Sequence, residues 1–128
     1  MIEWINGNVM SLVVTFNTNN LTLNQNAVAH FSESRYVTVG IDHQKHALVI
    51  HPVTKEELEM NVFLPEQMHK ISIGNGYGKI SNKQMCDQIA RYLDKELVGQ
   101  KFYASYQTRD RMLVISFNNP VQQEESHG

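Results

Sequence analysis

The chain has 128 residues, of which 41% are hydrophobic and 19% are charged, and its net charge at pH 7 is −2. This length and composition are typical of one globular domain that can bury a core without a metal or a disulfide. The single cysteine, Cys86, excludes an internal disulfide, and no apolar run approaches the roughly 18 residues of a membrane span. Because the start shows no signal-peptide pattern, the sequence predicts a cytoplasmic protein that does not enter a membrane.

Charge is distributed unevenly along the chain. Residues 1–69 contain seven acidic and three basic side chains, whereas residues 70–111 contain eight basic and four acidic ones. Such a split is typical of a protein with an oriented charged surface, and ordinary solvated faces produce it too. The slightly acidic total disfavours a protein that holds nucleic acid by charge alone.

Two segments, residues 12–53 and 71–118, show the same order of predicted elements. Each begins with a short apolar strand, at residues 12–14 and 71–73. Each then passes through an Asn- or Gly-rich stretch into a second short strand. The sequence therefore predicts an internal duplication.

A helix start is predicted at the same place in both copies. Thr22 is followed three residues later by Gln25, which fits a capping box. Ser81 is followed by Gln84 in the same way, 59 positions further along. We expect a short first helix with these apolar side chains: Ala27, Val28 and Phe31. We expect a longer second helix, ended by Gly99, with this apolar stripe: Cys86, Ile89, Ala90, Leu93 and Leu97.

Each copy ends in a predicted β-hairpin. Apolar residues alternate over residues 37–41, and a return strand follows at residues 47–50. The same pattern recurs 65 positions later, at residues 102–106 and 112–115. The strand alternation predicts this core: Val14, Leu21, Val37, Val39, Ile41, Leu48, Ile50, Ile71, Ile73, Ile80, Phe102, Ala104, Tyr106, Leu113 and Ile115.

A linker is predicted between the copies, at residues 54–70. Thr54 and Glu57 form a third capping-box pattern in it, which predicts a short linker helix. We interpret residues 1–118 as a single domain and residues 119–128 as a flexible polar tail.

Few residue patterns suggest chemistry. The glycine-rich residues 74–79 resemble a phosphate-binding loop, but Ile80 stands where such a loop needs Ser or Thr directly after the lysine. Asp42 is the only further candidate metal ligand near three closely spaced histidines: His43, His46 and His51. Cys86, on the apolar helix stripe, is expected to be buried and unreactive. We therefore predict no cofactor, no metal site and no enzymatic activity.

Short motifs of the second copy resemble a known family. Residues 77–81 read Tyr-Gly-Lys-Ile-Ser before the helix, residues 97–101 read Leu-Val-Gly-Gln-Lys after it, and Leu-Val-Ile follows at 113–115. This order is similar to the swapped-hairpin barrel of the AbrB, MazE and MraZ proteins. Their pattern is Gly-Arg-Ile/Val-hydrophobic-Ile-Pro, a helix, a Gly-Asp step into a strand and a final apolar strand. In the present chain Gly-Gln replaces Gly-Asp, and the Asp-x-x-x-Arg signature of MraZ is absent.

The resemblance covers residues 12–118 and implies a fold. That fold is mostly β with short helices, an internally duplicated swapped-hairpin barrel of the AbrB type. In AbrB and MazE two chains each supply one unit, whereas MraZ carries two units in one chain of about this length. One chain of this protein is therefore expected to complete the barrel, and a further dimer stays open.

The resemblance also implies a function, a DNA-binding transcriptional regulator with duplex DNA as its partner. The candidate DNA contacts are these basic residues: Lys70, Lys79, Lys83 and Arg91. The alternative is a protein-interaction module, antitoxin-like or accessory to a mobile element or phage, that binds a protein or a second copy of itself without DNA. The basic second half favours the regulator, and the acidic first half favours the interaction module.

Overall fold

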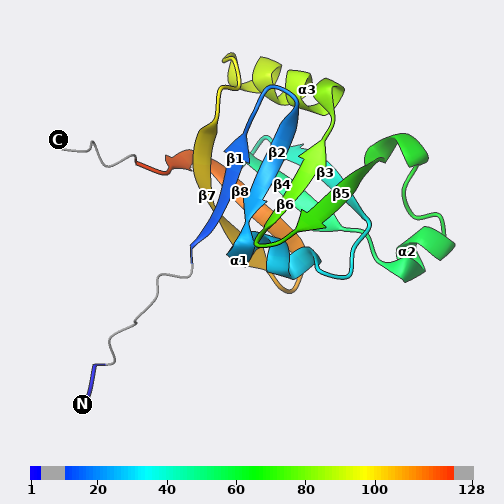
Figure 1. The fold of residues 1–128 in the computed structure, drawn as a ribbon, viewed down its shortest axis with the longest axis horizontal. Coiled ribbons are helices and arrows are strands. Elements are labelled where there is room, and N and C mark those ends of the chain that lie inside the picture. The colour runs from blue at the N-terminus through cyan, green and yellow to red at the C-terminus, as the bar shows by residue number, and fades with distance from the viewer. Residues whose placement is uncertain (4–10, 123–128) are drawn as a thin grey trace.

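The computed structural model of the protein describes residues 1–3 and 11–122, and these form eight strands with three short α-helices (Figure 1). The strands are β1 (Leu12–Phe16), β2 (Asn20–Asn24), β3 (Tyr36–Asp42), β4 (Ala47–Pro52), β5 (Met68–Gly74), β6 (Tyr77–Ser81), β7 (Gln100–Gln107) and β8 (Met112–Pro120). The helices are α1 (Gln25–Val28), α2 (Lys55–Glu59) and α3 (Lys83–Leu93). The 3-10 turn η1 (Ala29–Phe31) extends α1, and η2 (Pro65–Gln67) precedes β5. No helix in this described part is long and apolar enough to cross a bilayer.

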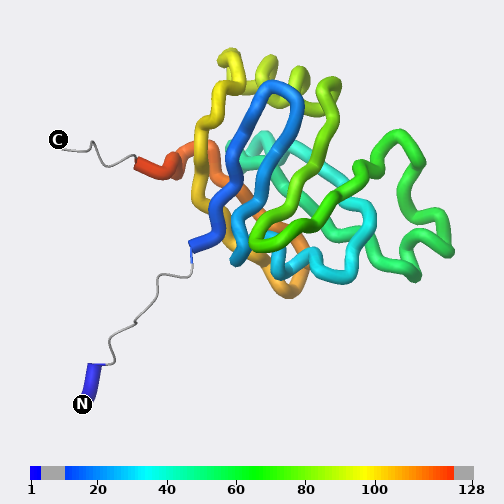
Figure 2. Tube along the Cα trace, viewed as in Figure 1, coloured from blue at the N-terminus to red at the C-terminus, as the bar shows by residue number. Residues whose placement is uncertain are grey.

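The strands close into an antiparallel barrel. They pair in the order β1-β2-β6-β5-β3-β4-β8-β7, and β7 returns to pair with β1. The hairpins β1–β2 and β5–β6 lie side by side toward the viewer in Figure 1, with β4 and β8 behind them. Helix α3 crosses one end of the barrel, and α1 lies at the opposite end (Figure 1 and Figure 2). The predicted mostly β barrel with few short helices is confirmed at this level.

Strand pairing follows matching registers in the two halves of the chain, except at the start of β7, where the register with β8 shifts and that of β3 with β4 does not. Val14 of β1 pairs with Phe102, and His69 of β5 pairs with Val37 in the same way. Between β2 and β6 the register is symmetric about the Leu21–Ile80 pair, because Asn20 pairs with Ser81 on one side and Thr22 pairs with Lys79 on the other. Between β4 and β8, the pairs Leu48–Ile115 and Ile50–Leu113 mirror each other in the same manner. Renumbering β1–β4 as β5–β8 therefore leaves every neighbour relation in the barrel unchanged.

The predicted correspondence of residues 12–14 with residues 71–73 is wrong by four positions. Thr15 pairs with Lys101 as Lys70 pairs with Tyr36, so Lys70 occupies the place of Thr15. The physical reason is the connection that follows. β5 continues to Gly74 and a two-residue turn, whereas β1 ends earlier, at a longer polar loop.

The barrel interior is apolar. These predicted core residues are buried: Val14, Leu21, Val37, Leu48, Ile50, Ile71, Ile80, Leu113 and Ile115. These are partly buried and pack against the core: Val39, Ile41, Phe102, Ala104 and Tyr106. The prediction is wrong for Ile73, which is 44% exposed. Ile73 lies where β5 extends past β3, and its one strand partner, Gly78, has no side chain to cover it.

The two short-helix starts lie later than the capping-box patterns predicted. Thr22 is inside β2, and Asn24 caps α1 by accepting a hydrogen bond from the Ala27 N–H. Asn82, not Ser81, caps α3. In β2 and β6 the strand continues through the hydroxyl residue, so the next asparagine takes the capping position.

The end of α3 also differs from the expectation. Asp94, with φ of 52°, terminates the helix, and Gly99, with φ of 95°, instead lies just before β7. Leu97 is buried although it lies beyond the helix. The apolar residues Ala27, Val28 and Phe31 of the first helical segment are buried as predicted.

The linker and tail boundaries move by a few residues. Both hydrogen bonds of the Thr54–Glu57 capping box are present, so the predicted linker helix is confirmed as α2. β5 begins at Met68, inside the predicted linker. β8 reaches Pro120, so residues 119 and 120 belong to a strand instead of the predicted tail. Residues 123–128 lie outside the described residues.

Candidate functional site

The outer face of β5, β6, β2, β1 and β7 carries a row of neighbouring side chains. Strand pairing places them side by side in this order: Ser72, Lys79, Thr22, Thr15 and Lys101. Except at Ser72, whose neighbour Ile73 is itself exposed, each alternates with buried or half-buried residues of its own strand, so the row points away from the core. Because adjacent strands lie about 4.8 Å apart, Lys79 and Lys101 are about 14 Å apart over three strand spacings.

This face is positively charged. Lys70, two residues before Ser72 on β5, is exposed on the same side of the sheet. No aspartate or glutamate occurs in these five strands. We call the surface around Lys70, Lys79 and Lys101 the basic face. Its lysines have no acidic neighbour within the sheet to neutralise them.

Polar and aromatic side chains surround the three lysines. Tyr77 and Tyr103 each lie two residues from a lysine on the same strand, and they are 44% and 36% exposed. The outward residues of β2 are an amide, a hydroxyl and an amide: Asn20, Thr22 and Asn24. The face therefore combines positive charge with hydrogen-bond donors and flat aromatic surfaces, which suits a polyanion such as nucleic acid.

Two of the four predicted DNA contacts, Lys70 and Lys79, come together on the basic face. Lys83 instead forms an ion pair with Asp87, with 3.2 Å between Nζ and Oδ2. Arg91 lies two turns further along α3, and this helix crosses one end of the barrel (Figure 1). Sequence reasoning missed Lys101. The outward alternation of β7 was visible, but its place beside β1 depends on closure of the barrel.

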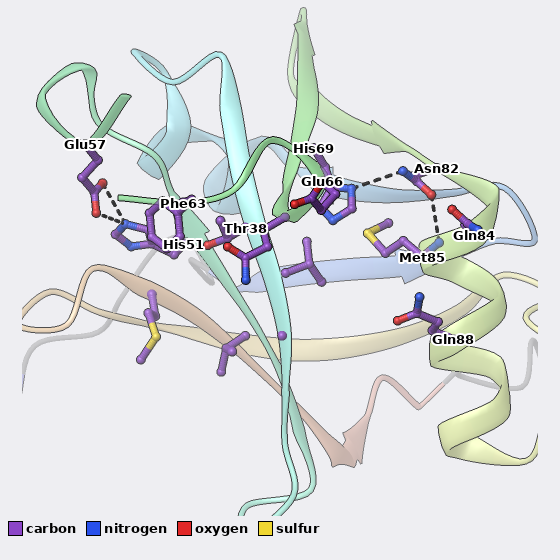
Figure 3. Close-up of a pocket in the computed structure, with 15 residues that line it drawn as sticks. Thr38, His51, Glu57, Phe63, Glu66, His69, Asn82, Gln84, Met85 and Gln88 are labelled. Carbon is purple, nitrogen blue, oxygen red and sulfur yellow. Dashed lines mark hydrogen bonds and ion pairs between the residues drawn. The ribbon is translucent and has the colours of Figure 1, made fainter. Parts of the chain in front are cut away.

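A groove lies on a different side of the molecule. It has a volume of about 640 Å³ and is bounded by the linker with α2 on one side and by the first turns of α3 on the other (Figure 3). Thr38 and Gly40 of β3, with Val49 of β4, form its floor. Amide side chains predominate near α3, from Asn82, Gln84 and Gln88 (Figure 3).

His51 and Glu57 close one end of the groove (Figure 3). His51 Nε2 lies 2.9 Å from Glu57 Oε1, and Nδ1 lies 2.7 Å from the Arg111 carbonyl oxygen. Both ring nitrogens of His51 thus lie within hydrogen-bond distance of oxygen atoms, which holds the ring at this end of the groove. Burial acts to raise the pKa of Glu57, but hydrogen bonds from the Thr54 N–H and from His51 outweigh it, and the pKa lies below its usual 4.5.

His69 lies in the middle of the groove. It occupies the place in β5 that buried Val14 has in β1. The Asn82 amide donates to His69 Nδ1 over 3.2 Å, while Asn82 Oδ1 accepts from the Met85 N–H and caps α3. His69 Nδ1 therefore carries no proton, and burial holds the pKa of this ring below its ordinary value.

The edge of β3 is open beside this groove. β5 pairs with β3 only at Tyr36, Val37 and Thr38. The corresponding seam lies between β1 and β7. There the pairing includes one further residue pair, in which Leu12 lies opposite Ala104. Within residues 11–122, no strand pairs with Val39 on the β5 side. Its backbone N–H and C=O groups are thus available to an added strand.

The other residues that the sequence singled out for chemistry form no reactive or metal-binding arrangement among the described residues. Cys86 is fully buried, and burial raises the pKa of its thiol. The glycine-rich residues 74–79 form the β5–β6 turn and lead into a strand, not a helix. His46 bonds Tyr92. In the described part of the chain, no three His, Cys, Asp or Glu side chains gather as a metal site.

Comparison with known proteins finds no matching family model, no matching curated protein and no matching solved structure.

Proposed function

We propose that this chain is a DNA-binding transcriptional regulator, built as an internally duplicated barrel of the AbrB, MazE and MraZ type. The observation that carries the proposal is the basic face, where Lys70, Lys79 and Lys101 project from strands without any acidic residue. Phosphate neutralisation by lysine and arginine supplies most of the non-specific affinity for DNA. A face of this kind provides it even in a chain whose net charge is −2.

The pairing of the strands supports the duplication. Hairpins from the two halves alternate around the barrel: β1–β2, then β6–β5, then β3–β4, then β8–β7. Each half therefore places its two hairpins on separate arcs and depends on the other half to join them. The matched registers around Leu21–Ile80 and Val49–Val114 support an approximate two-fold relation between the halves.

The lysines of the basic face would hold phosphates rather than read bases. Lysine side chains that contact phosphate fix the register of a protein on the duplex but carry no sequence information. The amide of Asn20, whose Oδ1 accepts hydrogen bonds from Asn17 and Thr22, adds a neutral donor to the same surface. Tyr77 and Tyr103 can pack against sugars at the edge of the contact.

The test is binding to a random-sequence duplex, measured by fluorescence anisotropy at two salt concentrations. Replacing Lys79 and Lys101 with alanine should weaken binding to every sequence and reduce the salt slope by about two units, one for each lysine. The matched control replaces Lys45 and Lys55, which are exposed outside these five strands, and should leave affinity nearly unchanged. Absence of binding by the unmodified protein at low salt would refute the regulator.

The open edge of β3 favours a second candidate, a protein-interaction module. An extended peptide that pairs with Val39 would take the position that Leu12 takes against Ala104 in the other half. The probe is a lysine-flanked synthetic peptide carrying residues 11–16 of this chain. We expect it to shift the Val39 amide resonance in NMR spectra and to lose affinity for the Val39→Pro variant. Unchanged spectra would exclude this candidate.

A further inference from the structure

A second cavity, of about 500 Å³, lies between the end of α3 and strands β7 and β8. Its walls are aromatic side chains of Tyr92, Phe102 and Phe117. Lys95 and Lys101 line it as well and are otherwise exposed. No acidic residue among those described lines this cavity. It is separate from the groove between α2 and α3.

The aromatic walls support one another. The rings of Phe102 and Phe117 meet edge to face with centroids 5.6 Å apart, and Tyr92 lies 5.9 Å from Phe117. The Tyr92 hydroxyl lies 2.7 Å from Nδ1 of His46, and this hydrogen bond fixes the tyrosine ring. Phe117 is 8% exposed, whereas Tyr92 and Phe102 are only half-buried. The cavity is therefore a preformed apolar slot with ring surface still available to a ligand.

An irregularity in the sheet forms the other side of the cavity. The β7–β8 register shifts between Phe102 and Ala104, so Phe102 lies opposite Pro120. The Val121 N–H then bonds the Lys101 carbonyl oxygen over 2.8 Å. Such a bulge bends its strand and redirects side chains. Phe102 lines the cavity beside this irregularity, and its ring also packs edge to face on Phe16 of β1, with centroids 5.4 Å apart.

We propose that this cavity binds a planar aromatic carboxylate. A flat ring would pack against the half-buried rings of Tyr92 and Phe102, and the carboxylate would reach the ammonium groups of Lys95 and Lys101. Apolar walls with a few charged groups at the rim are the usual arrangement of small-molecule sites. A cationic rim without acidic residues selects an anion over a neutral or cationic ring of the same shape.

The site would also regulate the basic face, and this step rests on the proposed DNA binding. Lys101 belongs to both surfaces, because it lines the cavity and stands in the row with Thr15 and Lys79. A bound carboxylate engages the charge that the DNA phosphate would use. The ligand and the duplex therefore compete, and each weakens the binding of the other by the same factor.

The direct test is an NMR titration with 1-naphthoate, with 1-naphthalenemethanol and 1-naphthylmethylamine as the neutral and cationic comparators. We expect naphthoate to bind most tightly and to shift the resonances of Leu93, Phe117 and Val121. Replacing Lys95 or Lys101 with glutamine should each weaken naphthoate binding about two- to fivefold and leave the neutral alcohol unaffected. Lys55→Gln is the matched control and should change neither ligand.

Equal binding of the three probes, or shifts confined to other regions, would overturn the proposal. A second measurement separates it from the proposed function. Naphthoate should lower the affinity of the unmodified protein for duplex DNA, and it should have little effect on DNA binding by the Lys101→Gln variant. If the protein binds no DNA, the regulator fails, and the direct titration still decides whether the cavity takes an aromatic carboxylate.

Discussion

Replacing Leu113 or Leu48 with alanine tests the barrel at two positions that the register makes equivalent. Both leucines are fully buried, and each lies beside the Val49–Val114 pair. Removing a buried leucine side chain beyond its Cβ loses the transfer free energy and leaves a cavity, which together cost about 2–5 kcal/mol. That loss is a large fraction of the roughly 5–15 kcal/mol stability of a small domain. Because the two leucines hold equivalent positions in the β4–β8 pairing, we expect the two variants to lose similar amounts of unfolding free energy.

Equilibrium unfolding in urea measures these free energies. Val114→Ala is the matched control, because Val114 alternates with Leu113 on β8 and is only half-buried on the outer side. It should cost under about 1 kcal/mol, the range expected of a side chain away from the core. A loss below about 1 kcal/mol for Leu113→Ala would show that the register of β8 is wrong. A large difference between Leu48→Ala and Leu113→Ala would argue against equivalent halves.

Three further predictions concern single side chains. The pKa of Glu57 is lowered in the folded state, so its contribution is present above its ordinary value of 4.5 and is lost as the pH falls through the folded-state pKa. Glu57→Gln should therefore cost about 1 kcal/mol at pH 7 and progressively less as the pH falls through the folded-state pKa, as measured by urea unfolding over a pH series. Asn82→Ala removes the cap of α3 and should cost about 1 kcal/mol, with loss of helical circular dichroism, and an unchanged spectrum would contradict the capping role. Cys86 should resist a thiol reagent until the protein unfolds, since it is fully buried, and rapid labelling of the native protein would disprove this.

Much of the barrel is predictable from the alternation of apolar and polar residues. Hairpin β3–β4 and hairpin β7–β8 match the expected strands because each has a buried face and a solvated face along its length. The predicted alignment of residues 12–14 with residues 71–73 was wrong because both segments are short and mostly apolar, and such a run does not indicate which residues correspond. Only the pairing partners reveal that Phe16, not Leu12, has the place of Ile71.

The positions predicted for the two helix starts were wrong for a related reason. A hydroxyl residue followed three residues later by glutamine satisfies the capping-box pattern in a helix, but a strand tolerates both residues too. Leu23 continues the alternation of β2 past Thr22, and burial of this leucine in the core extends the strand by two residues. Tertiary burial outweighs a local cap that contributes about 1 kcal/mol.

The candidate site was predictable only in part, because a surface collects residues from strands that are distant in sequence. Lys70 and Lys79 share one hairpin, so local pattern finds them together. Lys101 joins them only because the chain closes β7 onto β1, which no local pattern specifies.

The same closure changes the meaning of the net charge. The first half of the chain is acidic, and by its sequence alone this half favours the interaction module over a nucleic-acid binder. Strands β1 and β2, however, carry none of this acidity, whereas four glutamates are in or close to α2 and η2: Glu56, Glu57, Glu59 and Glu66. The strand order of the barrel places the uncharged strands β1 and β2 between the lysine-bearing strands β6 and β7. The local field of a surface depends on the charges within about a Debye length, so this face is basic on a protein whose total charge is negative.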